Sequence, residues 1–254
     1  IYYPINTLIS IGIKDILIIT TPEDQIYFKN LLLRNDDFDV KFEFEVQQKP
    51  NGIAQAFIIG EKFIKNNNVA LILGDNFFYG QSLTQILKQS IKLQSGAKIF
   101  LHPVKNPNLY GVATVNKRKK VIKLVEKPKK TISNLAVTGL YFFDKKAVEY
   151  SKKLKPSSRN ELEIIHLLNK YKNSNKLKAD LIGRGGTWLD TGSISDFYDA
   201  SNFISTVENR QGLKIACIEE IALRNKWIGK KEVENAIKFY GKCNYSKYLQ
   251  SIIS

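Results

Sequence analysis

Residues 69–80 read Val-Ala-Leu-Ile-Leu-Gly-Asp-Asn-Phe-Phe-Tyr-Gly. The first five are apolar throughout, which is typical of a strand buried on both faces of an α/β sheet. Gly74 then allows a tight turn, and Asp75 places a carboxylate just beyond the end of that strand. Ligands of open α/β sheets bind in the crevice outside the carboxyl ends of the strands. The stretch therefore predicts an α/β fold with Asp75 beside a ligand.

Strands and helices alternate on either side of this stretch. We expect strands at 15–20, 40–46, 69–73 and 98–101, and helices at 2–11, 21–33, 53–63 and 83–93. Strands that alternate with helices over short connections usually lie parallel. The pattern therefore predicts a Rossmann-like, mostly parallel sheet flanked by helices, formed by an α/β domain of residues 1–214.

The pattern changes in the second half of the chain. Further strands are expected at 111–115, 121–126, 137–143 and 177–182, with another ending near residue 190, and helices at 145–153, 160–171 and 194–208. From residue 215 onward the apolar residues recur at helical spacing. Residues 215–254 are therefore expected to form a small C-terminal helical lobe.

Composition and charge exclude several classes of protein. The 254 residues are 43% hydrophobic, enough for a large core, and no run approaches the roughly 18 apolar residues of a membrane span. Lysine carries nearly all of the net charge of +15, since only six of the 39 basic residues are arginine. Nucleic-acid readers favour arginine set among aromatics, so we expect no nucleic-acid partner and no membrane partner. Two cysteines, Cys217 and Cys243, fit a reducing cytoplasm.

A second acid occupies a place comparable to that of Asp75. Asp190 follows the apolar pair Trp188-Leu189 and precedes Thr191-Gly192. Two acids at strand ends, with no histidine or thiolate nearby, suit a hard cation such as Mg²⁺ rather than zinc. Each aspartate could instead only cap the helix that follows it, and the spacing alone does not bring the two together.

Two further strand ends carry residues suited to a phosphorylated ligand. Lys127 is a mobile point charge that suits a phosphate, and Glu126 beside it could accept hydrogen bonds from sugar hydroxyls. The alternative for this pair is a plain exposed hairpin end. Gln47 can read the edge of a base, and Gly52 permits close approach of the backbone. No serine or cysteine nucleophile stands beside a base, so the chemistry is expected to need none.

Seven strings, taken together, resemble the glucose-1-phosphate thymidylyltransferases, a family of bacterial sugar-nucleotide pyrophosphorylases. They are LILGDNFFYG, QQKPNGIAQAF, NLYGVATV, EKPKKTISNLAVTGLYFFD, PSSRNELEI, GRGGTWLDTG and TVENRQGLKIACIEEIALRN. The resemblance runs in order from Ile1 to Ser254, and the last string points to the thymidylyl branch rather than the uridylyl branch.

The resemblance implies nucleotidyl transfer. The phosphate of glucose 1-phosphate would attack the α-phosphorus of dTTP in line, giving dTDP-glucose and pyrophosphate for dTDP-rhamnose and lipopolysaccharide biosynthesis. Asp75 and Asp190 would hold Mg²⁺, and Lys127 would clamp the sugar phosphate. Placement and charge neutralisation suffice for such a transfer, which agrees with the absence of a nucleophile in the sequence.

The resemblance also implies how each substrate is held. Glu126 and the backbone of Gly111 and Val137 would bind the glucose. Gln47 and Gly52 would read the thymine of dTTP.

Family members are also similar to one another in assembly and feedback control. The resemblance implies a homotetramer with a second, allosteric nucleotide site. Matching strings place five residues at that site: Tyr79, Gly80, Arg184, Glu220 and Arg224.

One departure from the family pattern concerns the start of the chain. The family's first strand, its glycine-rich GGxGTR loop and a nearby catalytic lysine would precede Ile1, and the sequence contains no methionine. We therefore expect an N-terminal truncation that impairs turnover. Two alternatives remain: a pyrophosphorylase of the same fold that uses UTP or CTP, and a non-catalytic regulatory homologue that binds sugar nucleotides.

Overall fold

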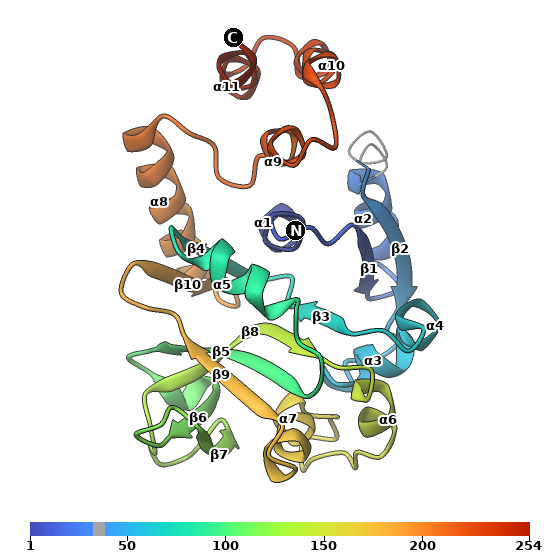
Figure 1. Ribbon diagram of the computed structural model, residues 1–254, viewed down its shortest axis with the longest axis vertical. Helices are drawn as coiled ribbons and strands as arrows, with labels where there is room; N and C mark the ends of the chain where they lie inside the picture. Colours follow the sequence, from blue (N-terminus) through green and yellow to red (C-terminus); the bar gives the residue numbers. More distant parts are fainter. Residues whose placement is uncertain (33–38) are drawn as a thin grey trace.

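The computed structural model describes residues 1–32 and 39–254 (Figure 1). The described strands are β1 (Asp15–Thr20), β2 (Lys41–Val46), β3 (Val69–Ile72), β4 (Asn76–Gly80), β5 (Ala97–Pro103), β6 (Gly111–Val115), β7 (Val121–Glu126), β8 (Leu135–Phe143), β9 (Leu177–Leu181) and β10 (Gly186–Asp190).

The helices lie between and after these strands. They are α1 (Tyr2–Ile9), α2 (Gln25–Leu32), α3 (Gln55–Ile59), α4 (Glu61–Ile64), α5 (Leu83–Ser90), the 3₁₀ helix η2 (Pro107–Leu109), α6 (Ala147–Lys152), α7 (Ile164–Asn173), α8 (Ile194–Gln211), α9 (Ile218–Arg224), α10 (Lys230–Tyr240) and α11 (Asn244–Ile253). Within the described residues, no helix is both long and apolar enough to cross a membrane.

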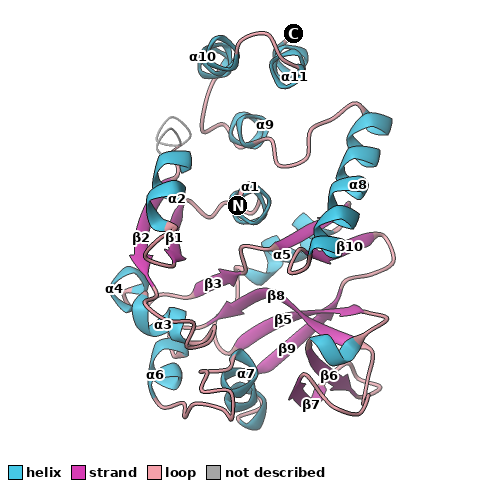
Figure 2. Cartoon of the chain, turned by 180° about the vertical axis from the view of Figure 1, so that it is seen from behind, coloured by secondary structure: helices cyan, strands magenta, loops and turns pink. Residues whose placement is uncertain are grey.

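The largest sheet is built around β8. Its strands follow the order β7-β6-β8-β5-β9, and β3 also pairs with β8. Separate two-stranded ladders join β1 to β2 in parallel and β4 to β10 in antiparallel orientation. Figure 2 shows helices packed around these strands, as expected for an α/β fold.

The direction of the strands corrects the expectation of a mostly parallel sheet. Parallel pairing is found in β1–β2 and β5–β9, whereas β8 runs antiparallel to β3, β5 and β6, and β6 runs antiparallel to β7. The sheet is therefore mixed. One reason is that a short turn joins β6 to β7, and strands joined in this way pair antiparallel. The antiparallel pairs of β8 with β3 and β5 join segments that are distant in the sequence.

Most expected elements are found with shifted ends. The expected helix at 53–63 is divided at Gly60 into α3 and α4. The one expected at 160–171 begins only at Ile164, because the backbone is left-handed at Asn160, with a φ of 60°, and extended at Glu163, with a ψ of 135°. Residue 33, the expected end of another helix, lies outside the described residues. Strand β4 was not among the expected elements.

Alternate residues of β8 face two separate cores. Tyr141 and Phe143 pack in one core with residues of α3, α6 and α7. Leu140 and Phe142 pack in the other with α5, β4 and Trp188 of β10. Successive side chains of a strand point to opposite faces, so a central strand between two helical layers has to be apolar along its whole length.

A third core joins the two ends of the chain. Residues of α1 and β1 pack with residues of α9, α10 and α11, among them Ile9, Ile16, Ala222, Val233 and Leu249. In Figure 1 these C-terminal helices form one end of the molecule, next to α1 and away from β6 and β7. The boundary at residues 214 and 215 remains a prediction.

An open slot separates β1 from β3. A cavity of about 780 Å³ lies between them, lined by residues that include Leu17, Ile19, Ala70 and Ile72. Within the described residues β1 pairs only with β2, and β3 pairs only with β8. Each of the two strands therefore presents an unpaired edge.

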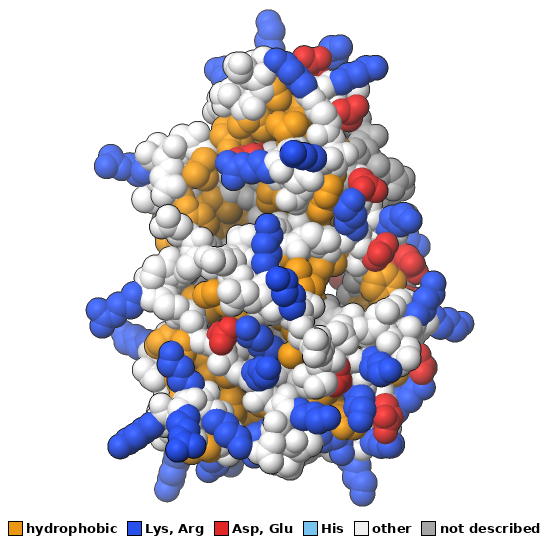
Figure 3. Space-filling view, in the orientation of Figure 1, with side chains coloured by type: hydrophobic (Ala, Val, Ile, Leu, Met, Phe, Trp, Pro, Cys, Tyr) orange, Lys and Arg blue, Asp and Glu red, His pale blue; other side chains and the backbone are white. Residues whose placement is uncertain are grey.

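Basic side chains are spread over the surface. Figure 3 shows Lys and Arg along the whole length of the visible face rather than gathered in one stripe. Such a distribution agrees with a solvated, cationic surface.

Candidate active site

The β4–β10 ladder brings the two acids together. Asn76, the residue after Asp75, lies opposite Asp190 in this ladder. Thr191 donates two hydrogen bonds to the carbonyl oxygen of Asp75, one from its backbone nitrogen and one from Oγ1, both at 3.0 Å. The structure thus places Asp75 and Asp190 at the ends of neighbouring chain segments.

The environment of Asp190 shows two carboxylates close to each other. Partial burial raises the pKa of Asp190, and the nearby charge of Asp75 raises it further, whereas a hydrogen bond from the backbone nitrogen of Gly192 opposes the rise. Like charges at one site disfavour ionisation, and a bound cation would reverse that effect. No group of three or more His, Cys, Asp or Glu suited to a metal occurs among the described residues. A pair of carboxylates is the number that Mg²⁺ usually takes from a protein.

Glu126 and Lys127 lie at the end of β7, next to the start of β6. Glu126 pairs with Gly111 in the β6–β7 ladder, and Lys127 donates from its backbone nitrogen to the carbonyl oxygen of Tyr110 at 3.0 Å. Lys127 adopts a φ of 40°, in the left-handed region. A side chain at Gly111 would come within 3.1 Å of a carboxylate oxygen of Glu126. The hairpin end is therefore closely packed around Glu126.

These residues line one cavity of about 310 Å³. Five of the expected site residues contribute to it: Gly111, Glu126, Lys127, Val137 and Asp190. Its apolar and aromatic walls include Ile53, Tyr110, Tyr141, Ile165 and Trp188. A concave site with aromatic walls and a few converging charges is the usual form of a small-molecule site.

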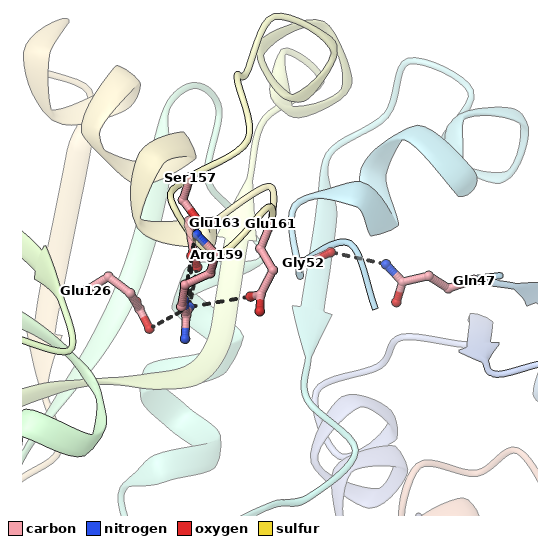
Figure 4. Close-up of polar contacts among 7 residues, drawn as sticks. All are labelled: Gln47, Gly52, Glu126, Ser157, Arg159, Glu161 and Glu163. Atoms are coloured by element: carbon pink, nitrogen blue, oxygen red, sulfur yellow. Dashed lines mark hydrogen bonds and ion pairs between the residues drawn. The ribbon is translucent and has the colours of Figure 1, made fainter. Parts of the chain in front are cut away.

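Arg159 joins three glutamates at the edge of this cavity, as Figure 4 shows. Its Nη2 atom lies 2.8 Å from both carboxylate oxygens of Glu163, 3.4 Å from Glu161 and 3.5 Å from Glu126. Ser157 donates a further hydrogen bond to Glu163 at 2.8 Å. Residues 156–164 carry part of the family resemblance, but Arg159, Glu161 and Glu163 were not predicted as site residues. Its dense charge was the signal available.

The same cluster sets the ionisation of Glu126. Burial raises the pKa of Glu126 above its ordinary value, and the neighbouring charge of Glu163 raises it further. Arg159 and Lys127 act in the opposite direction. The two cationic groups therefore limit the rise in the pKa of Glu126, and its carboxylate form can accept hydrogen bonds from hydroxyl groups.

Gln47 and Gly52 form a second small unit. Gln47 donates from Nε2 to the carbonyl oxygen of Gly52 at 3.2 Å, a contact drawn in Figure 4, and to Oε1 of Gln55 at 2.7 Å. Gly52 has a φ of 98°, and a Cβ there would lie 2.5 Å from the carbonyl oxygen of Leu162. The structure brings these two residues together, but neither lines the 310 Å³ cavity.

The residues expected at a second nucleotide site fall into separate groups. Tyr79 and Gly80 lie on β4 and pair with Thr187 and Gly186 of β10, and Arg184 lies in the connection before β10. Glu220 and Arg224 form an ion pair at 2.5 Å on α9. Within the described residues, no hydrogen bond or ion pair joins the strand residues to those of α9.

Comparison with known proteins decides the family. The model of the family described as Nucleotidyl transferase matches residues 1–207. A glucose-1-phosphate thymidylyltransferase of Neisseria meningitidis is 48% identical over 253 residues, which cover 100% of this chain and 88% of that protein. The chain belongs to the glucose-1-phosphate thymidylyltransferase family.

Other members of the glucose-1-phosphate thymidylyltransferase family agree in sequence and in fold. The relative named so in Mycobacterium tuberculosis is 41% identical over 253 residues, with 100% of this chain and 88% of that protein covered. A Bacillus anthracis protein described as a candidate member, solved with a sucrose, matches 80% of this chain and 81% of its own at a TM-score of 0.73 and 36% identity.

A UDP-glucose pyrophosphorylase structure with UDP-glucose, 24% identical, shows the same fold at a TM-score of 0.68, with 81% of this chain and 86% of that chain covered. The expected α/β nucleotidyltransferase fold is confirmed.

Proposed function

We propose that this thymidylyltransferase family member forms dTDP-glucose and pyrophosphate from dTTP and glucose 1-phosphate. A phosphate oxygen of glucose 1-phosphate attacks the α-phosphorus of dTTP. A new P–O bond forms, the bond from the α-phosphorus to the bridging oxygen of the β-phosphate breaks, and pyrophosphate leaves with the bonding pair. The step needs no covalent intermediate, which suits a site without a nucleophile.

The observation that carries this proposal is the 310 Å³ cavity in which Glu126, Lys127 and Asp190 meet. Glu126 accepts hydrogen bonds from the sugar hydroxyls, while the backbone of Gly111 and Val137 closes around the ring. Lys127 reaches the sugar phosphate as a point charge. The aromatic walls exclude water, which strengthens these electrostatic interactions.

Asp75 and Asp190 are the residues that would hold Mg²⁺. When bound, Mg²⁺ supplies neutralisation of the phosphate charge that grows during the transfer. The pair at the β4–β10 ends supports this assignment, because their mutual repulsion favours a cation. Gln47 and Gly52 would then read the thymine from the opposite side of the site.

We extend the proposal to the oligomeric state of the enzyme, its allosteric control and its metabolic pathway. Helix α8 exposes Ile194, Phe197 and Tyr198, and this apolar surface supports association between copies of the chain, which we propose to form a homotetramer. An allosteric nucleotide would bind to five residues, which are Tyr79, Gly80, Arg184, Glu220 and Arg224. These residues lie in two separate groups, and a partner subunit would complete the site. We place the enzyme in the cytoplasm, in dTDP-rhamnose and lipopolysaccharide biosynthesis.

The decisive assay is pyrophosphate release from dTTP and glucose 1-phosphate with and without Mg²⁺. Asp75→Asn should abolish this release, because the substitution removes one of the two carboxylates proposed to hold Mg²⁺. Asp199→Asn changes an exposed acid on α8 and should leave the release unchanged.

Two results would change the proposal. Faster release with UTP or CTP than with dTTP would favour a pyrophosphorylase with another base preference. No release with any of these nucleotides, combined with binding of dTDP-glucose, would favour a regulatory homologue.

A further inference from the structure

Asn76 is buried between the two strands that carry the acids. It is the first residue of β4, with 3% of its surface exposed. Its side-chain amide makes three hydrogen bonds. Nδ2 donates to Oδ1 of Asp75 at 2.7 Å, while Oδ1 accepts from the backbone nitrogen of Gly139 at 2.9 Å and from Nε1 of Trp188 at 2.5 Å.

The two donors fix which way the amide points. A backbone nitrogen and an indole nitrogen can only donate, so both have to face the oxygen of Asn76. The amide nitrogen consequently faces Asp75, and a flipped amide would set donors against donors. The orientation of Nδ2 is therefore determined by β8 and β10, not by Asp75 itself.

Close packing prevents the amide from moving away. A Cβ at Gly139 would overlap Oδ1 of Asn76. Because position 139 is glycine, the strand β8 can approach Asn76 closely enough for its backbone to donate. The arrangement links three strands, β4, β8 and β10, to one oxygen of Asp75.

We propose that Asn76 is a positioning residue that aims the carboxylate of Asp75 at the divalent cation. The inference rests on the proposed function, in which Asp75 and Asp190 hold that cation. With Oδ1 of Asp75 held by Asn76, the other carboxylate oxygen, Oδ2, is left in a fixed direction for the metal. Partners that orient metal ligands in this way commonly contribute 10- to 100-fold to metal affinity.

The test measures metal binding without turnover. Free Mn²⁺ is followed by electron paramagnetic resonance during titration of the protein, and Mg²⁺ and Ca²⁺ affinities are obtained by competition. Asn76→Ser removes the amide and its reach to Asp75. We expect the Mn²⁺ dissociation constant to rise about 10- to 100-fold. The Mg²⁺ constant should rise more than that of Ca²⁺, because Mg²⁺ demands near-ideal octahedral geometry and Ca²⁺ tolerates distortion.

Thr138→Val is the matched control. Thr138 is fully buried next to Gly139, and its Oγ1 atom donates to the carbonyl oxygen of Phe100 at 3.1 Å. In the part of the chain that the structure describes, no hydrogen bond joins Thr138 to Asp75. The substitution removes a buried hydrogen bond from the same part of β8. We expect it to lower the unfolding temperature and to leave metal affinity unchanged.

The outcomes separate this inference from the function on which it rests. Loss of Mn²⁺ binding in Asp75→Asn, with unchanged affinity in a folded Asn76→Ser, would overturn the positioning role alone. Equal losses for Mg²⁺ and Ca²⁺ would also overturn it. Unchanged Mn²⁺ binding in Asp75→Asn would overturn the metal assignment and the inference together.

If Asn76→Ser does not fold, Trp188→Phe gives a second measurement. It removes one of the two donors that orient the amide of Asn76. We expect a smaller loss of Mn²⁺ affinity than in Asn76→Ser, with Mg²⁺ binding again weakened more than Ca²⁺ binding. No loss of Mg²⁺ affinity in that variant would overturn the inference.

Discussion

Substitution of Arg159 by glutamine tests whether the charged cluster at the cavity is held together by a buried ion pair. Arg159 makes three charge-assisted hydrogen bonds to Glu163, two from Nη2 at 2.8 Å and one from Nε at 3.0 Å. Glu163 is 5% exposed. Removing the guanidinium leaves a buried carboxylate whose remaining side-chain donor is Ser157.

The expected loss can be estimated from this exposure. Removal of one partner from a buried ion pair costs about 3–5 kcal/mol. The side chain of Arg159 is 40% exposed and Ser157 still donates, so water and the hydroxyl recover part of that cost. We expect a loss of about 2 kcal/mol in the free energy of unfolding. For a chain of this size, that corresponds to a fall of about 4–8 °C in Tm.

The assay is thermal unfolding followed by circular dichroism, with Lys153→Gln as the control. Lys153 pairs with Glu149 at the same spacing of four residues, but the two side chains are 64% and 55% exposed. Exposed pairs add little to stability, so the Tm of that variant should match the unsubstituted protein. Equal shifts in the two variants would refute the claim that burial of Glu163 sets the cost.

Three further predictions follow from the site and the core. The pKa of Glu126 is raised, and Arg159 limits that rise, so the acidic limb of kcat/KM for glucose 1-phosphate should move to higher pH in Arg159→Gln. Because the pKa of Glu126 is higher in the folded protein than in the unfolded chain, its contribution to stability falls as the pH rises through the folded-state pKa. Gly52→Ala places a Cβ at a φ of 98° and against Leu162, so a higher KM for dTTP and a loss of about 1–3 kcal/mol in urea unfolding are expected. Tyr171→Phe removes a buried hydrogen bond of 2.8 Å to Asp144, and calorimetry should show a loss of about 1–2 kcal/mol.

The local pattern of apolar and polar residues was sufficient to predict most of the helices and strands. The strand expected at 15–20 is found with those bounds as β1, and that expected at 121–126 as β7. Their apolar and alternating residues are contiguous in the sequence, so a short window contains the whole signal. Strand direction depends instead on which distant segments pair, and no window of residues around β8 shows that both β3 and β5 lie antiparallel to it.

Candidate residues were similarly easier to find than their partners. Glu126 and Lys127 are adjacent in the sequence, and their common cavity follows from one hairpin. Arg159 reaches the same cavity from the segment before α7, and only tertiary packing brings it to Glu126. A charged residue in a loop gives no local sign of which carboxylates it will meet.

The convergence of Asp75 and Asp190 shows why the strand that was missed matters most for function. Thr191 bonds to the carbonyl oxygen of Asp75 across 116 residues of sequence, and β4 is the element that allows this. Phe77 and Phe78 are buried on its two faces, so β4 lacks the polar alternation by which a short strand is recognised. Both faces of β4 are buried, because the strand packs against α1 and also against the core that contains Phe78 and Trp188. The same burial that hides the strand from sequence patterns fixes β4 against β10, and this pairing brings the segments that carry Asp75 and Asp190 side by side.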